Sequence, residues 1–300
     1  MKKLTKEQKF FIDKQLEFAE ELYDQSDEQL KAVFKQQLSN REDIFKEIGK
    51  VVLSYNVSDS SLSIGSIEKK KLKEKLNRII KDKIQDELIN ETNLTDKLLK
   101  STGKEKYNIN NYLHDIGMNV SWDIKPVDYE TLKDVINTKV DNKLWSDRLW
   151  ENKNAIQKDL QLEINDFLNG KTSVNEIEAK IKKKYNSNAY NTKRLINTEI
   201  CRVQSSINDV WGENHSIKYQ MFMATLDGKT SELCRNFDGK TFNINDINKP
   251  VPPLYPFCRS ALINLPSKEW KPKSRIDNIT KQNISWQTYK EWKEKHETLT

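Results

Sequence analysis

Residues 217–226 read IKYQMFMATL and decide the fold, because apolar residues that recur at helical spacing before this point alternate within it. Positions 217, 219, 221 and 223 point to one side of the expected strand, and positions 222, 224 and 226 to the other. A strand that is apolar on both faces is typical of a central strand covered on both sides. We therefore predict a small β-sheet with this strand at its centre.

Two turn signals, Asp227-Gly228 and Asp238-Gly239, follow the strand. The second lies between Phe237 and Phe242, which is consistent with a hairpin whose glycine takes a positive φ. Upstream, apolar residues at 196, 200, 203, 207 and 210 share one face of a helix. We expect the sheet to pack on this helix, which gives an α+β module.

The chain before this helix is predicted to be helical. Apolar positions at helical spacing indicate helices over about residues 11–23, 30–48 and 72–88, with a capping box starting at Ser26. The period weakens between 102 and 127, where we place a domain boundary. Another helix opens at Trp145 and stops at Gly170, and a capping box at Ser173 starts a short one. The fold class is mainly α with a small C-terminal β-sheet (α+β).

Composition excludes several classes of protein. Of the 300 residues, 32% are charged and eight are glycine, a balance that suits long helices with solvated faces. The net charge of +6 is modest and its signs are interspersed, so the total does not define a nucleic-acid-binding protein. Three cysteines are too few for a secreted disulfide scaffold, and no segment approaches the roughly 20 apolar residues of a membrane span. We expect a protein of a reducing, aqueous compartment that binds no membrane.

Short motifs recur in a fixed order through the last third of the chain. They are Thr198-Glu199, the TLD sequence at 225–227, Cys234, the FDGKTF sequence at 237–242 and the PPLYPFCR sequence at 252–259. Together they resemble the phage head morphogenesis family, the minor head proteins related to the F protein of phage Mu. The WSDRLW sequence at 145–150 resembles the segment that precedes this block in some members, so the resemblance covers about residues 140–266.

The resemblance divides the chain and points to its motif residues. We expect an N-terminal helical domain over 1–125, a Mu F-like head morphogenesis module over 126–266 and an aromatic, basic extension over 267–300. The residues expected to have a structural role in the motifs are Thr198, Glu199, Asp227, Cys234, Asp238, Gly239, Pro253, Pro256, Cys258 and Arg259.

The cysteines admit more than one interpretation. Family members often carry a histidine where this chain has Tyr255, and some carry a cysteine at Ser260. Because structural zinc generally needs four nitrogen or sulfur ligands, Cys234 and Cys258 fall short of a site. We expect buried structural thiols without metal or cofactor; a disulfide formed in the released virion and a metal site are the alternatives.

No catalytic motif is apparent, and we predict that the protein is not an enzyme. The three histidines are scattered, and no phosphate-binding loop or His-Glu-x-x-His motif occurs. The family places arginine before Thr-Glu, whereas this chain has Asn197. We expect Glu199, beside the apolar stripe of its helix, to bond a backbone amide or a basic side chain such as Arg202.

Basic residues gather near an aromatic residue at two places, where they can form either a solvated helix face or a contact with DNA phosphates. The candidate DNA contacts are Lys182, Lys183, Lys184, Lys271, Lys273 and Arg275. The final residues also carry an aromatic group that we expect to dock on the body of the protein or on a neighbour. Its members are Trp270, Trp286, Tyr289 and Trp292.

With the resemblance, these observations predict a minor head protein of a tailed bacteriophage, involved in head assembly and in DNA packaging or ejection at the portal vertex. The resemblance implies synthesis in the host cytoplasm and a place in the virion, inside the capsid near the portal. Its implied partners are portal protein, scaffold or major capsid protein, and double-stranded DNA bound without sequence specificity. The alternatives are a DNA-processing or toxin-like enzyme that uses Glu199 and Asp227, and a free-standing DNA-binding module.

Overall fold

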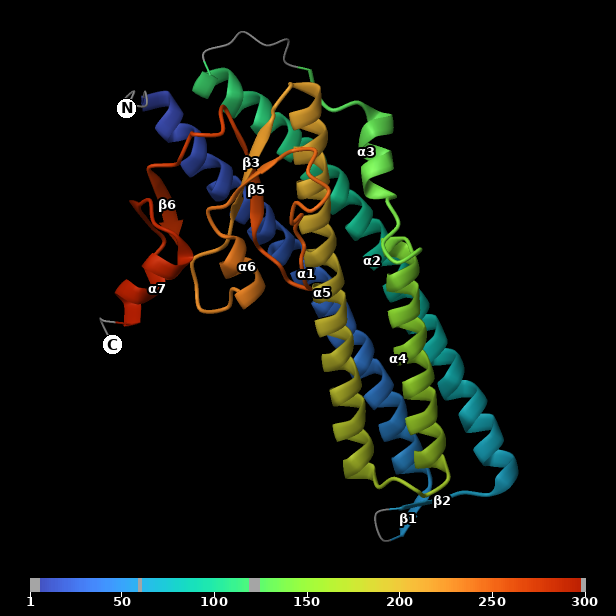
Figure 1. The fold of residues 1–300 in the computed structure, drawn as a ribbon. Helices are drawn as coiled ribbons and strands as arrows, with labels where there is room; N and C mark the ends of the chain where they lie inside the picture. Colours follow the sequence, from blue (N-terminus) through green and yellow to red (C-terminus); the bar gives the residue numbers. More distant parts are fainter. Residues whose placement is uncertain (1–5, 59–60, 119–124, 298–300) are drawn as a thin grey trace. The chain divides into compact units, whose positions relative to one another are not determined.

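The structure, a computed structural model, describes residues 6–58, 61–118 and 125–297 and is mainly α, with small antiparallel sheets in its C-terminal part (Figure 1). The helices are α1 (Lys6–Ser54), α2 (Ser66–Met118), α3 (Tyr129–Ile136), α4 (Trp145–Leu168), α5 (Val174–Asn214), α6 (Glu232–Phe237) and α7 (Tyr289–Glu297). The strands are β1 (Asn56–Ser58), β2 (Ser61–Ser63), β3 (Tyr219–Met223), β4 (Thr241–Asn243), β5 (Ala261–Leu265), β6 (Ser274–Asp277) and β7 (Gln282–Ser285). This confirms the predicted fold class.

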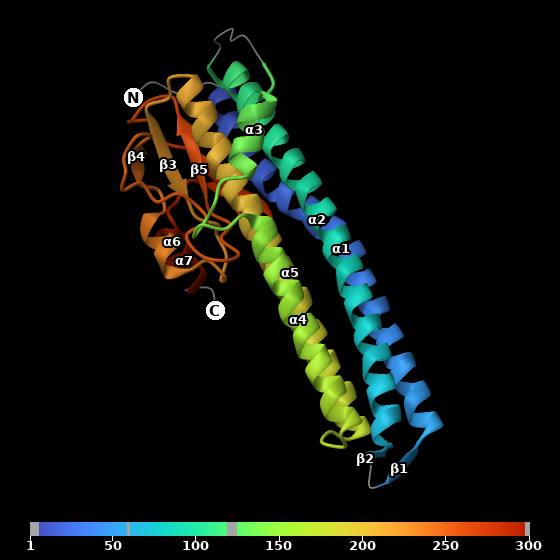
Figure 2. The same ribbon diagram turned by 90° about the vertical axis from the view of Figure 1, so that its right-hand side faces the viewer.

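The chain forms two compact units, each built from separate stretches of sequence. The bundle unit comprises residues 27–96 and 139–196, and the sheet unit comprises 1–26, 97–138 and 197–300. Helices α1, α2 and α5 each contribute residues to both units (Figures 1 and 2). The divisions at 125/126 and 266/267 that the sequence suggested stay predictions.

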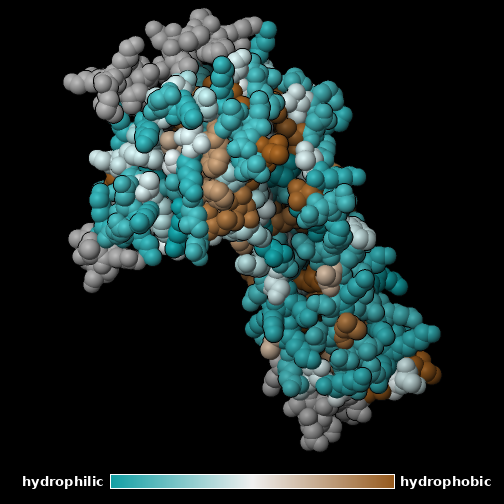
Figure 3. Space-filling view, viewed as in Figure 1, coloured by the Kyte–Doolittle hydropathy of each residue, from teal (hydrophilic) through white to brown (hydrophobic). Residues whose placement is uncertain are grey.

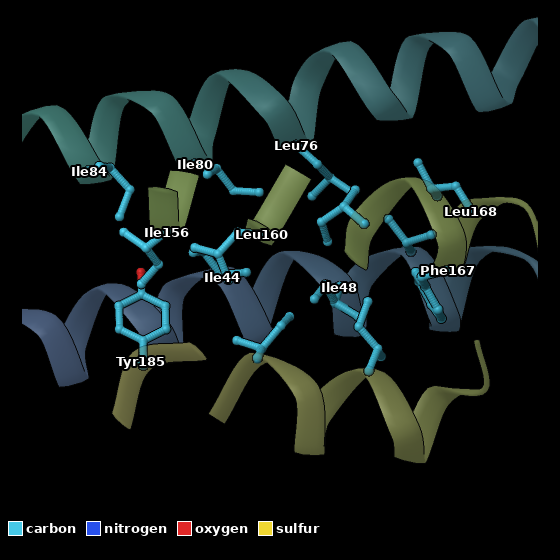
Figure 4. Close-up of a cluster of buried hydrophobic side chains, with 14 residues drawn as sticks. Ile44, Ile48, Leu76, Ile80, Ile84, Ile156, Leu160, Phe167, Leu168 and Tyr185 are labelled. Atoms are coloured by element: carbon cyan, nitrogen blue, oxygen red, sulfur yellow. The ribbon is translucent and has the colours of Figure 1, made fainter. Parts of the chain in front are cut away.

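Apolar side chains from four helices form the core of the bundle unit (Figure 4). Its fully buried members include Ile44 on α1, Ile80 on α2, Leu160 on α4 and Ile181 on α5. Burying a side chain of this size stabilises the fold by about 1.5–3 kcal/mol relative to leaving it exposed. Hydrophilic side chains dominate the visible surface in Figure 3, as expected for helices with one apolar face.

Three predicted helix boundaries are wrong, because the helices run on through local stop and start signals. Helix α1 continues through Ser26, where we expected a new helix to begin. Helix α2 continues to Met118, through the region where we placed a domain boundary. Helix α5 joins the two helices that we expected on either side of 185–195 into one of 41 residues. In α2 and α5, where Thr102, Tyr185 and Thr192 are buried, packing outweighs the weak propensity of a few polar residues or glycines.

Close packing gives the reason for the glycine at position 103. A Cβ atom there would clash with the side chain of Leu132 on α3. The glycine therefore allows α3 to approach α2 and does not end the helix. Two other predicted boundaries are confirmed: α4 ends before Gly170, whose φ is +69°, and Ser173 and Glu176 form the expected capping box at the start of α5.

Strand β3 is the central strand of a three-stranded antiparallel sheet in the order β4-β3-β5, as predicted. Met221 and Met223 on one face pack in a cluster with Leu113 of α2. Phe222 and Ala224 on the other face pack with Cys201 of α5. Both faces of the strand are thus covered, and the prediction that the sheet packs on α5 is confirmed.

The turn at Asp238-Gly239 has the predicted positive φ, with Gly239 at +75°. It follows the short helix α6, however, so the predicted simple hairpin is wrong. The Phe222 backbone receives a 2.8 Å hydrogen bond from the Gly239 amide and donates one of 2.9 Å to the Lys240 carbonyl. The turn therefore directs the chain into β4.

No helix among residues 6–58, 61–118 and 125–297 is long and apolar enough to cross a membrane.

One layer of the bundle unit is polar instead of apolar. Lys153 Nζ on α4 lies 2.9 Å from Glu87 Oε2 and 2.5 Å from Glu91 Oε1, both on α2. None of these side chains is more than 1% exposed. Two buried carboxylates therefore share one ammonium group, so the layer carries excess negative charge when both are ionised.

The other two helices complete the hydrogen bonding of this layer. On α1, Gln37 Nε2 donates to Glu91 Oε1 at 2.8 Å and Asn40 Nδ2 donates to Glu87 Oε1 at 2.9 Å. On α5, the Thr192 hydroxyl donates to Glu91 Oε2 at 3.0 Å. Because a buried polar group is costly unless it is bonded, these contacts favour one register of the four helices.

The layer predicts a pH dependence of folding. Burial raises the pKa of Glu91 and outweighs the lowering by Lys153, while neighbouring Glu87 raises it further. Tyr185 on α5 lies close enough for the charges of Glu87 and Arg41 to act on its pKa. A raised pKa means that the folded state binds more protons, so stability is lost as pH rises from the ordinary value of 4.5 through the raised value.

We expect Glu91→Gln to abolish this loss of folding stability with rising pH, because the amide has no proton to release. Urea unfolding between about pH 5 and 8 measures it, a window in which an unperturbed glutamate stays ionised. Glu178→Gln is the matched control: its carboxylate is exposed, its pKa is lowered by Lys182, and its removal should leave the pH slope unchanged. Equal slopes for wild type and Glu91→Gln would contradict the assignment.

Candidate functional site: the proline-rich motif loop

Residues 252–259, here called the motif loop, lie between β4 and β5 and contact several other elements of the sheet unit. The backbone amide of Phe257 donates a 3.4 Å hydrogen bond to Thr198 Oγ1 on α5. The amide of Ser231, the residue before α6, donates to the Tyr255 hydroxyl at 3.4 Å. The motif threonine and the tyrosine in the family's histidine position thus hold the loop against two helices. Of its motif prolines, Pro253 is half-buried and Pro256 is exposed.

Arg259, at the end of the motif loop, forms a bidentate ion pair with Asp227. The two guanidinium nitrogens lie 2.6 and 2.8 Å from the carboxylate oxygens. Burial alone would raise the pKa of Asp227, but the hydrogen bonds and charge of Arg259 outweigh it and hold the pKa below its ordinary range. Asp227 Oδ1 also accepts the amide of Lys229, which closes the turn after β3. Two of the predicted motif residues are therefore partners.

Cys258 lies in the motif loop and the other two cysteines lie close to it; all three are buried, and none forms a disulfide. Cys234 Sγ on α6 lies 3.8 Å from Cys258 Sγ. Cys201 Sγ on α5 lies 3.9 Å from the carbonyl oxygen of Ser260. The described part of the chain contains no group of three or more His, Cys, Asp or Glu side chains arranged to hold a metal ion.

Asp238 forms a second ion pair, with Arg275 on β6. Nη1 of the arginine is 2.8 Å from Oδ2 and its Nη2 is 3.1 Å from Oδ1, and both side chains are 1% exposed. The same carboxylate accepts the amides of Ala224 at 2.7 Å and Tyr289 at 2.6 Å. Arg275 also donates to the carbonyl of Ala224 and to that of Gln287. The prediction that Arg275 contacts DNA is therefore wrong, because its guanidinium is buried and its charge is paired.

Glu199 is connected to α3 through Arg202. Its Oε2 accepts a 2.7 Å hydrogen bond from Arg202 Nε, the contact that we expected. Arg202 also donates to the carbonyls of Val135 at 2.7 Å and Ile136 at 3.0 Å, at the C-terminal end of α3. A cation at a helix C-terminus is favourable because the unpaired carbonyls there carry negative partial charge. Glu199, only 1% exposed, thus orients the arginine that holds α3.

The remaining candidate DNA contacts lie in different surroundings. Lys182 and Lys184 on α5 are paired with Glu178 at 2.6 Å and Asp159 at 2.8 Å. Lys183 between them is exposed, and the described residues offer it no ion-pair partner. Lys271 and Lys273 are exposed in the sheet unit. The lysines of α5 belong to the bundle unit, and Lys271 and Lys273 belong to the sheet unit.

The aromatic residues of the tail dock on the sheet unit, one of the two outcomes that we expected. Trp270 packs in the cluster with Met221 and Met223. Tyr289 and Trp292 on α7 pack with Leu226, and the Tyr289 hydroxyl donates to the carbonyl of Asp227 at 2.8 Å. Arg275 lies over the ring of Trp286, 5.1 Å from its centroid. The tail is thus part of the same core as the motif residues.

Sequence reasoning did not predict the long-range partners of two arginines. Arg275 lies 37 residues from Asp238, and Arg202 lies 66 residues from Ile136, so no local pattern could pair them. The only local signal was Glu199 three residues before Arg202, a spacing that places side chains together on a helix. Within the motifs, Asp227 pairs with Arg259 and Cys234 contacts Cys258, whereas Asp238 is bonded by Arg275, which lies outside them.

These features define a mainly helical protein whose small C-terminal sheet packs with a proline-rich loop. Residues 158–263 match the family described as Phage Mu protein F like protein. This confirms the resemblance for that stretch, which carries a Mu F-like domain and indicates a phage head morphogenesis protein and hence a protein of the virion. No curated protein and no solved structure matches the chain.

The two arginine pairs should differ in their contribution to stability. Arg275→Met leaves the buried Asp238 carboxylate without its cation and should cost about 3–5 kcal/mol of unfolding free energy. Arg259→Met removes a side chain that is 36% exposed and should cost about 1 kcal/mol or less. Urea denaturation compares them. If Arg275→Met keeps full stability but loses affinity for DNA, the structural role is refuted and the prediction that Arg275 contacts DNA is supported.

Proposed function

We propose that this chain is a minor head protein of a tailed bacteriophage that acts in head assembly at the portal vertex, and there in DNA packaging or ejection. The observation that carries the proposal is the Mu F-like domain at 158–263 together with motif residues that are consumed in holding the fold. Such an arrangement is more typical of a structural component of an assembly than of an enzyme.

We further propose that the protein lies inside the capsid near the portal and that it is not an enzyme. The enzyme alternative requires Glu199 and Asp227 to act on a substrate, yet each carboxylate is held by an arginine within 2.7 Å. The purified chain should therefore leave nucleic acid intact. Cleavage that is lost in Asp227→Asn while the fold is retained would support the enzyme instead.

Portal protein is the proposed principal partner, with scaffold or major capsid protein as further ones. The aromatic tail is buried against the sheet unit, so the docking surface must use other residues. Trp150 on α4 is 57% exposed and is of the residue type most enriched at interface hot spots.

We expect the chain and its cognate portal protein, expressed together, to form a complex that survives size-exclusion chromatography. Trp150→Ala should weaken this complex about tenfold or more if that side chain is an anchor. Lys158→Ala on the same helix, also exposed, is the control and should bind normally. Absence of the protein from both portal complexes and purified DNA-filled virions would refute the assembly role.

Packaged double-stranded DNA is the second proposed partner, through the outer face of α5. A shallow hollow there is lined by Lys182, Lys183, Asn186, Ser187 and Tyr190, together with Ala179 and Asn191, and no acidic residue lines it. Amide and hydroxyl groups beside lysines suit phosphate oxygens, and contacts of this kind carry no sequence information. Lys183, whose charge has no ion-pair partner among the described residues, is the strongest candidate.

Binding of this kind should be independent of sequence and fall steeply with salt. The slope of log affinity against log salt should be about −0.9 for each phosphate contacted. Lys183→Gln should make the slope shallower by about 0.9, whereas the control Lys158→Gln should leave it unchanged. Fluorescence titrations at several salt concentrations measure both. If no binding is found at low salt, DNA is removed from the proposed partners.

A further inference from the structure

The three cysteines lie together in the sheet unit, and Cys258 itself belongs to the motif loop. Cys234 and Cys258 are both fully buried, with their sulfur atoms 3.8 Å apart. Cys201, which also contacts Cys258, directs its sulfur toward the Ser260 carbonyl, 3.9 Å away. The separation of 3.8 Å must shorten to about 2.05 Å, the length of an S–S bond, for the pair to become a disulfide.

The surroundings keep this pair reduced while the fold is closed. The contact with Cys258 and burial both raise the pKa of Cys234, and the contact with Cys201 and burial raise that of Cys258. Because the thiolate is the nucleophile in disulfide exchange, buried thiols of this kind react slowly with oxidants. Reaction therefore requires access from outside.

The motif loop holds the pair inside the sheet unit. Leu254 and Tyr255, both half-buried, pack against the same apolar cluster as Cys234 and Cys258. The loop is anchored by hydrogen bonds to Ser231 and Thr198, each 3.4 Å long, and by the ion pair between Arg259 and Asp227. Because both sulfurs are fully buried, an oxidant can reach them only when the sheet unit opens locally.

We propose that Cys234 and Cys258 are a redox pair, which a small-molecule disulfide converts into an intramolecular disulfide joining α6 to the motif loop while Cys201 stays a thiol. The Cys258 thiolate attacks the oxidant's S–S bond, which breaks and releases one small-molecule thiolate. The Cys234 thiolate then attacks the mixed disulfide at the Cys258 sulfur and releases the second. The two protons lost by the protein thiols protonate the two leaving groups, and the two electrons given up by the protein reduce one oxidant molecule.

The bond would close a ring around α6, β4 and most of the motif loop. Such a ring restricts the unfolded chain and should raise the melting temperature of the sheet unit by about 5–10 °C. The chemistry does not depend on the proposed function. Only its use, to lock the fold when a particle leaves the reducing cytoplasm, rests on the phage role, and thiol counting and portal binding test the two separately.

The test uses the full chain, incubated with oxidised glutathione and then denatured and alkylated. We expect one alkylated thiol per chain in place of three, and a peptide map that joins Cys234 to Cys258. Cys201→Ala should still form the bond and gain the same thermal shift. Cys258→Ala cannot form the bond, so its two remaining cysteines should stay thiols or carry glutathione.

Three results would overturn the proposal. They are three free thiols after oxidation of the wild type, a bridge that includes Cys201, or a stable glutathione adduct on the wild type in place of the internal bond. Because the wild-type peptide map decides between these results, the conclusion does not depend on whether Cys258→Ala folds.

Discussion

The sheet unit depends on the buried ion pair between Asp238 and Arg275. An unpaired charge in this position would cost several kcal/mol, so the fold is stable only when both partners and their remaining hydrogen bonds are in place. Asp238 supplies those bonds by accepting the amides of Ala224 and Tyr289. Arg275 supplies them by donating to two backbone carbonyls. One pair thus joins the end of β3, the turn after α6, strand β6 and the start of α7.

This constraint explains why the C-terminal residues are part of the fold. The basic, aromatic sequence after residue 266 has the composition of a surface extension, yet its arginine fills a buried site in the unit. The planar guanidinium suits that site because it can bond a carboxylate through two nitrogens and still reach carbonyls with the same nitrogens. The exposed lysines beside it keep their charges in water.

The bundle unit solves a related problem with different residues. There, one lysine faces two carboxylates, and amide and hydroxyl side chains from α1 and α5 complete the bonding. An ammonium group offers three donors without a fixed plane, so it can be shared between two helical positions one turn apart. Both units therefore contain a buried charge that only one arrangement of their elements can satisfy, which favours a unique packing.

The sequence by itself determined the local features whose cause is local. The alternation over 217–226 gave the central strand with two covered faces, and Ser173 with Glu176 gave the start of α5. The motif order pointed to the Mu F-like domain. The i,i+3 spacing of Glu199 and Arg202 placed that pair correctly, because helix geometry alone brings such residues together.

Only the tertiary structure decided the long helices and the partners of buried charges. The local stop signal at Gly103 was overruled by packing against Leu132, since propensities of at most about 1 kcal/mol per residue are small beside a buried face. The pairing of Asp238 with Arg275, and of Lys153 with Glu87 and Glu91, joins residues far apart in sequence. Charge, burial and hydrogen bonding select those partners after the chain has folded back on itself, so no pattern within a single segment carries the information.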